Sequence, residues 1–167
     1  MSTYAEYVTY FSAVAASHVN ILHTANAPRF YPSLDEMVEK SRIVVKRDAT
    51  KCILFMDETS VAGAGNHADN NHHIRSIAVF CVQQCNKSDY SVINAAQSFC
   101  EERIYEIIAK IKKDKEDDTD GGLFTDFNPN RWSAERVGPM FDNWYGYMVE
   151  LEVQSNVNLE YNAAKWQ

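Results

Sequence analysis

The sequence lacks any apolar run of the about 18 residues that a membrane-spanning helix requires. Its N-terminus, MSTYAEYVTYF, has none of the basic residues that begin a signal peptide. It also lacks a clustered Lys/Arg footprint, and its net charge of −7 argues against a surface for nucleic acid. We therefore expect a protein that is made and used without export, with no membrane and no sequence-specific nucleic acid among its partners.

Internal repeats, low-complexity tracts and domain linkers are also lacking, so the 167 residues predict one domain, 1–167. Apolar residues make up 46% of the chain and aromatic residues 12%, values that exclude a disordered protein. A domain of this size buries about 70% of the surface that its unfolded chain would expose. A sizeable core is therefore possible.

Cysteine is scarce, with four residues in all. Cys52, Cys81 and Cys100 lie inside apolar runs, where a free thiol behaves as a small hydrophobic side chain. On one strand, Cys81 and Cys85 would lie roughly 13 Å apart, which is beyond the reach of a disulfide. We expect four reduced cysteines.

The clearest pattern that is present runs from Asp89 to Lys115 and predicts a long amphipathic helix. Such a helix would be roughly 40 Å long, enough to cross a small sheet. Ser88 or Asp89 would cap its start, and Gly121 or Gly122 would supply the left-handed residue at its end. Its apolar stripe consists of Val92, Ile93, Ala96, Phe99, Cys100, Ile104, Ile107, Ile108 and Ile111.

Two further helices are predicted in the N-terminal part of the chain. Residues 3–23 carry an apolar stripe at helical spacing behind a possible cap at Thr3. A capping box in SLDE, residues 33–36, opens a short helix through about residue 40. The segment 26–32 between them holds two prolines, so we expect a connector there.

Strand-like patterns fill much of the remaining chain. The segments 51–57 and 75–85 are almost continuously apolar, and the Gly-, Asn- and Ala-rich stretch 61–74 would join them as a long hairpin loop. Residues 144–153 alternate between apolar and polar side chains, as expected of an antiparallel strand with one polar face. The strand-like segments in chain order are 43–45, 51–57, 75–85, 131–137 and 144–153.

This order of elements predicts an α+β fold. We expect an antiparallel or mixed sheet of about four strands, with an N-terminal helix and one long central helix packed on one of its faces. The aromatic residues between 123 and 139 would form a covering loop.

Gly63, Gly65 and Ala68 spell G-x-G-x-x-A after a predicted strand, which is nominally a dinucleotide-binding fingerprint. That motif requires a helix to begin at the glycines, so that backbone N–H groups can hold a pyrophosphate. Here the glycines lead into Asp69 and Asn70 and then into another strand. A flexible hairpin loop explains them better, and we assign no cofactor.

His67, Asp69 and His72 lie close together in the same stretch and are candidate metal ligands, because imidazole and carboxylate groups bind transition metals. Their spacing matches no closed structural site. His72 and His73 are adjacent, so in an extended segment only one of them could join His67. We favour a solvated polar loop over a metal site here.

Carboxylates occur in pairs at Asp57–Glu58 and Glu101–Glu102. Paired carboxylates can serve acid–base chemistry when their environments differ. Neither pair has a histidine, lysine or nucleophile at a recognisable spacing, so we assign no catalytic residue and expect no enzyme.

The C-terminal segment FDNWYGYMVELEVQSNV, an aromatic entry followed by a long alternating strand, resembles the closing strand of phage tail terminator or tail completion proteins. The order of elements is also similar to that family's, although the segment 26–46 has no place in its pattern. The resemblance implies a structural virion component that is assembled in the host cytoplasm. Its subunits would form a ring, typically of six, that meets the tail tube and the head–tail connector.

The parts of such a subunit that its central helix leaves uncovered are the expected contact surfaces: the 61–74 loop, the 116–131 loop and the polar face of the last strand. The candidate interface residues are His67, Asn70, His72, Phe124, Phe127, Glu150 and Glu152. Two alternatives stay open. One is a small enzyme or metal-binding domain with its site at the 63–73 loop, and the other is a non-viral adaptor that binds proteins.

Overall fold

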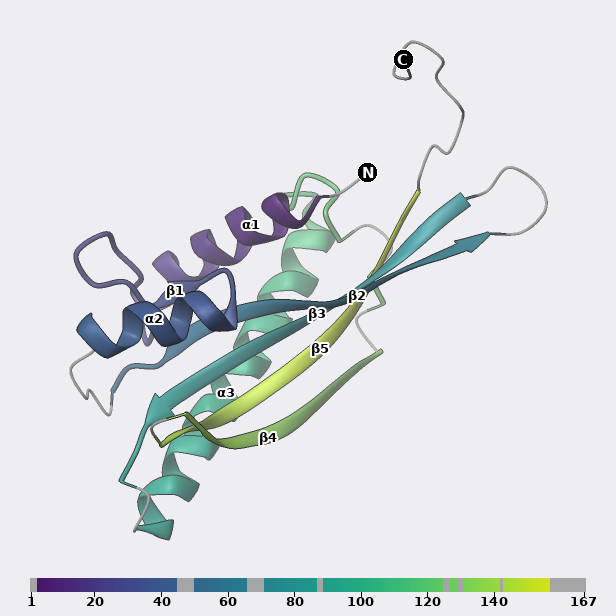
Figure 1. Ribbon diagram of the computed structural model, residues 1–167. Helices are drawn as coiled ribbons and strands as arrows, with labels where there is room; N and C mark the ends of the chain where they lie inside the picture. Colours follow the sequence, from purple (N-terminus) through teal and green to yellow (C-terminus); the bar gives the residue numbers. More distant parts are fainter. Residues whose placement is uncertain are drawn as a thin grey trace, which may run out of the picture.

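The computed structural model describes residues 3–44, 50–65, 71–86, 89–124, 127–128, 131–141 and 143–156. These residues form three helices and a five-stranded sheet in the order β1-β2-β3-β5-β4 (Figure 1). β1 and β2 are parallel and the other neighbours antiparallel, which confirms the α+β class with one strand more than expected. The elements are α1 (Tyr4–Ser17), β1 (Phe30–Tyr31), α2 (Leu34–Val44), β2 (Ile53–Gly65), β3 (Asn71–Gln84), α3 (Tyr90–Glu116), β4 (Trp132–Met140) and β5 (Trp144–Asn156).

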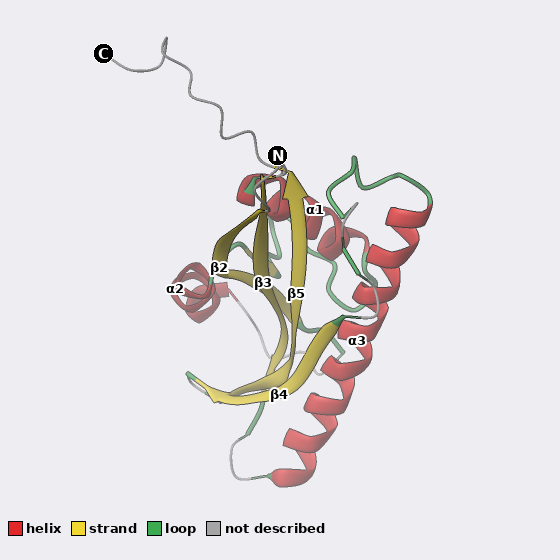
Figure 2. Ribbon diagram, turned by 90° about the vertical axis from the view of Figure 1, so that its right-hand side faces the viewer, coloured by secondary structure: helices red, strands yellow, loops and turns green. Residues whose placement is uncertain are grey.

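The long helix α3 is the central packing element, as predicted. Asp89 caps it, because its side chain accepts the backbone N–H groups of Ser91 and Val92 at 2.9 and 3.2 Å. Its isoleucine stripe packs on β5 and β3, and Figure 2 shows the helix along one face of the sheet. The apolar period in the sequence therefore identified the buried side of this helix, except at Val92 in the first turn, which is 42% exposed.

The end of α3 differs from the expectation. Asp118, with φ of 53°, supplies the left-handed residue directly after the C-cap Asp117, in place of Gly121 or Gly122. The Asp118 and Thr119 N–H groups donate to the carbonyls of Lys115 and Asp114, which is a Schellman arrangement. The two glycines also have positive φ, but they lie in the following turn.

Helices cover both faces of the sheet, which corrects the expectation of one covered face. α1 and α3 lie on one face, and α2 lies on the other (Figures 1 and 2). Alternation along β2 explains the two cores: Leu54 and Met56 pack under α1 and α3, while Ile53 and Phe55 belong to the core under α2. Within the described chain, no helix is long and apolar enough to cross a membrane.

The two N-terminal helices have other bounds than predicted. Thr3 caps α1 in a capping box, but the helix ends at Ser17, and Val19 beyond it is 69% exposed. α2 begins after Ser33, whose Oγ accepts the Glu36 N–H at 3.2 Å, and it continues to Val44. The strand predicted at 43–45 is therefore wrong at its first two residues, and its third lies outside the described residues.

The connector at 26–32 contains a strand. Phe30 and Tyr31 form β1, which pairs with Leu54 and Phe55 of β2. A strand of two residues is too short to show an apolar period in the sequence. It forms because Phe30 and Tyr31 can pair with β2. The other predicted strands are present, and all four cysteines are free and buried, as expected.

Candidate functional site

The hairpin between β2 and β3 is longer than predicted and forms a projecting arm. Its strands pair as far as Gly65 opposite Asn71, so most of the 61–74 stretch is strand rather than loop. We use the name distal arm for residues 60–65 of β2, 71–76 of β3 and 152–156 of β5. These segments extend past the helices in Figure 1. The glycines of G-x-G-x-x-A lie in β2, so no helix begins at them and the dinucleotide motif is not formed.

A buried ion pair anchors the arm to the body. Arg75 of β3 pairs with Glu58 of β2, and its guanidinium lies 5.9 Å from the ring centroid of Tyr7 on α1. Both Arg75 and His73 are buried on this face of the sheet. The cation is therefore shielded from water, and its charge is neutralised by a carboxylate from the neighbouring strand.

The outer edge of β2 is open along the arm. Among the described residues, β1 pairs only with Leu54 and Phe55, so the rest of β2 has a strand partner only on its β3 side. Residues 60–63 are exposed, and Val61 is 53% exposed. An open strand edge carries backbone N–H and C=O groups that can pair with another strand.

The opposite edge of the sheet is β4, which in the described chain pairs with β5 alone. Most of its side chains are exposed, among them Glu135 and Arg136. Pro139 lies near its end, a position that an edge strand tolerates because no ladder partner needs the missing N–H. The segment 132–137 therefore presents the second open row of backbone groups.

Three aromatic side chains form a cluster beside β4. The Tyr105 ring of α3 lies 5.9 Å from Trp132 of β4 and 6.4 Å from Tyr147 of β5. Tyr105 is 43% exposed and Trp132 is 39% exposed. The Tyr105 hydroxyl donates to Glu101 Oε1 at 2.9 Å, and this bond, with some burial, raises the pKa of Tyr105 to about 12. We call Tyr105, Trp132 and Tyr147 the aromatic cluster.

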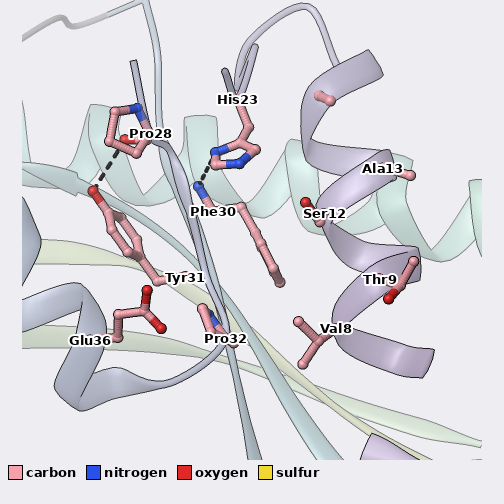
Figure 3. A pocket seen from close by; sticks show the side chains of 11 residues that line it. Val8, Thr9, Ser12, Ala13, His23, Pro28, Phe30, Tyr31, Pro32 and Glu36 are labelled. Carbon is pink, nitrogen blue, oxygen red and sulfur yellow. Dashed lines mark hydrogen bonds between the residues drawn. The ribbon is translucent and has the colours of Figure 1, made fainter. Parts of the chain in front are cut away.

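A pocket of about 580 Å³ lies between α1 and the segment 28–36 (Figure 3). His23 Nδ1 accepts the backbone N–H groups of Arg29 and Phe30 at 3.0 and 3.1 Å, which places the proton of the neutral ring on Nε2. Burial lowers the pKa of His23 and so favours this neutral form. The imidazole therefore positions β1, and the pocket wall also includes Ser12 and Glu36.

The candidate metal ligands His67 and Asp69 lie outside the described residues, as does the candidate interface residue Asn70. The backbone of His72 lies in β3, opposite Ala64 and Asn156, and its side chain is not among those described. Within the described ranges, no group of three His, Cys, Asp or Glu side chains could hold a metal ion.

Phe124 and Phe127 require a correction. Both are 0% exposed and belong to the main core, where Phe124 lies 4.9 Å from the Tyr10 ring, so they have no surface to offer a neighbouring subunit. Glu152 is exposed on β5, and Glu150 is half-buried on the same face, opposite Ser133 of β4. Of the candidate interface residues with described side chains, only these two glutamates reach the surface.

The open edge of β2 and the contact between Tyr105 and Trp132 were not predicted from the sequence. The open edge of β2 was missed because residues 60–63 are exposed on both faces of the strand, so this part of the sequence has no apolar period. Tyr105 did leave a signal, since it is an aromatic residue that falls outside the apolar stripe of α3. Its contact with Trp132 was not readable, because no local pattern joins residues of α3 and β4.

No protein-family model matches this chain, and no curated protein is similar enough in sequence to indicate a relationship. A functional interpretation therefore depends on the geometry of the two open edges and on the order of elements along the chain.

Proposed function

We propose that this chain is a structural subunit of the phage tail terminator or tail completion type, which assembles into a ring at the head-proximal end of a tail. The observation that carries the proposal is the pair of open sheet edges. One edge is β2 along the distal arm and the other is β4, and two strands, β3 and β5, separate them within the sheet.

Two different edges on opposite sides of one subunit favour a head-to-tail contact. Such a contact leaves one edge of each copy free for the next, and the series closes into a ring when the rotation between copies divides a full turn. A symmetric dimer would instead join the same edge of both copies. The arrangement therefore supports a ring, typically of six in the family that the sequence resembles.

The assignment to a tail is supported by the order of elements. An N-terminal helix, a long hairpin, a long helix and a closing strand occur in this order. The segment 28–44, with β1 and α2, is additional to that pattern and covers the second face of the sheet. The partners that follow from this assignment are copies of the chain itself, the tail tube and the head–tail connector, within the virion.

The test combines mass and imaging. Light scattering coupled to size exclusion, over a range of protein concentrations, should show a discrete oligomer, and negative-stain images should show rings. Tail tubes assembled without this chain should bind it at one end only. A protein that stays monomeric at high concentration and does not bind tubes contradicts the proposal.

A further inference from the structure

We infer that neighbouring subunits join edge to edge, with β4 of one copy adding to the open edge of β2 in the distal arm of the next copy. The inference rests on the proposed ring and names the surfaces that form it. The partner is a second copy of this chain, and the contact brings Val61 of the arm toward the aromatic cluster of the neighbour.

Strand direction supports this pairing. β2 and β5 run in one direction, and β3 and β4 run in the other, because each neighbouring pair among them is antiparallel. When a second copy continues the sheet in the same orientation, its β2 therefore lies antiparallel to β4. Antiparallel ladders are slightly more stable per residue than parallel ones and need no crossover connection.

Exposed apolar side chains on the two edges also lie on the same face of the sheet. Trp132 is opposite Leu151, which packs in the core under α1 and α3. Val61 is opposite Arg75, whose side chain lies on that same face against Tyr7. In a sheet that continues from one copy into the next, Val61 and Trp132 thus point to the same side, where both are partly exposed in the single chain.

Charge complements the backbone match. The open part of β2, residues 57–65, contains Asp57 and Glu58 and no basic residue. On the other edge, Arg131 and Arg136 outnumber Glu135. Because Glu58 is already paired with Arg75, this complementarity is one of net charge along the two edges rather than of a particular ion pair.

The arm edge is not protected in the way that edge strands of monomers usually are. Monomers place Lys, Pro or inward-pointing charges along an exposed edge to prevent pairing with other chains. Val61, Ala62 and Gly63 are small, uncharged and exposed, and the only irregularity in the β2–β3 register is the shift between Glu58 and Ser60. Their exposure fits an edge that is covered after assembly.

Lysine substitutions test the contact directly. Val61→Lys and Trp132→Lys should each raise the apparent dissociation constant of the oligomer by about tenfold or more, because each replaces an apolar side chain at the joined edges by a charge. Val19→Lys is the matched control, since Val19 is more exposed than Val61 and lies beside Lys51, before the start of β2 and at the opposite end of that strand from the distal arm. Circular dichroism melts should show that all three variants fold.

Cross-linking tests the head-to-tail geometry with milder changes. The four native cysteines are buried, so a bismaleimide should not react with the folded wild-type chain. Ala62→Cys and Ser133→Cys, each a single variant of an exposed residue on the other face from Val61 and Trp132, should give cross-linked dimers only when the two proteins are mixed. A chain with both substitutions should give a ladder of products that ends at the number of subunits in the ring.

The outcomes separate this inference from the proposed function. A wild-type chain that is strictly monomeric contradicts the ring, and the inference falls with it. An oligomer that resists both lysine substitutions and gives no mixed cross-link leaves the ring standing and overturns only the edge-to-edge contact. Cross-linking of Ala62→Cys with itself would show a symmetric contact and would likewise overturn the inference.

Discussion

The Tyr10 hydroxyl donates a hydrogen bond to Asp114 Oδ2 at 2.8 Å and so joins α1 to the end of α3 across 104 residues of sequence. Lys110 forms an ion pair with the other carboxylate oxygen of Asp114, which also accepts the Thr119 hydroxyl at 3.2 Å. Asp114 is buried. It is therefore the point at which α1, α3 and the following turn are held together.

Asp114→Ala should lower the free energy of unfolding by about 2–3 kcal/mol, because it leaves the partly buried Tyr10 hydroxyl without its partner. Denaturant unfolding measures this loss. The matched control is Asp117→Ala, which removes an exposed ion pair with Lys113 and should cost at most about 0.5 kcal/mol. Equal losses in the two variants would contradict the role given to Asp114.

The same carboxylate should make stability depend on acid pH. Burial would raise the pKa of Asp114, but Lys110, Tyr10 and Thr119 outweigh it and hold that pKa below its usual range. A lowered pKa in the folded state contributes stability above the unfolded pKa of about 4, and this stability is lost as the pH falls through the folded pKa. Asp114→Asn should flatten the pH dependence of unfolding below about pH 4. A variant with the wild-type slope there would contradict this prediction.

Removing the arginine at the base of the arm should destabilise the fold. Arg75→Met leaves the partly buried Glu58 carboxylate without its partner, and we expect a loss of about 2–3 kcal/mol in denaturant unfolding. Arg75→Met combined with Glu58→Gln should recover part of this loss, because no uncompensated charge remains. A double variant that is less stable than the single one would show that the ion pair itself stabilises the arm.

The Tyr105 phenol should titrate late. Its hydrogen bond to Glu101 raises its pKa to about 12, so Glu101→Gln should lower that pKa toward the ordinary value of about 10. Carbon NMR of ring-labelled tyrosine can follow this titration, with Tyr105→Phe to assign the signal. Glu102→Gln, one residue away on α3, is the control and should leave the titration unchanged.

The cysteines should be inert in the folded protein. All four are buried, and burial together with hydrogen bonds to Cys100 and Cys52 raises the pKa of the Cys81 thiol well above its usual range. A chromogenic disulfide reagent should detect no thiol in the native state and four after unfolding without reductant. Fewer than four thiols after unfolding would indicate a disulfide.

Local sequence patterns were sufficient to predict a helix or strand wherever buried and exposed side chains alternate with the period of that element. The isoleucine stripe and the Asp89 cap predicted α3, and the alternation from Trp144 onward predicted β5, because in both cases one face is core and the other is not. β1 could not be predicted, since Phe30 and Tyr31 become a strand only through pairing with β2. Ile43 is β-branched and suggested a strand, but α2 continues through it.

The candidate site was less accessible to sequence reasoning. The side chains of its two open segments, 60–63 and 132–137, are largely exposed, so no hydrophobic period marks them. The hairpin was predicted, but the predicted loop was too long. Gly, Ala and Asn usually indicate loops, whereas here Gly and Ala occupy strand positions from Val61 to Gly65 and Asn71 begins β3. An edge becomes visible only when the order of the strands is known.

The position of β5 also constrains how the chain is made. Among the described elements, β5 is the last in the chain but lies between β3 and β4 in the sheet, so this place in the sheet is filled by the segment that leaves the ribosome after the other described elements. Until β5 is in place, the edge of β3 that faces away from β2 is unpaired, and β4 has no strand to pair with. Folding during synthesis must therefore wait for residues beyond 144, and a chain stopped at 143 should be captured by chaperones that bind exposed apolar strands.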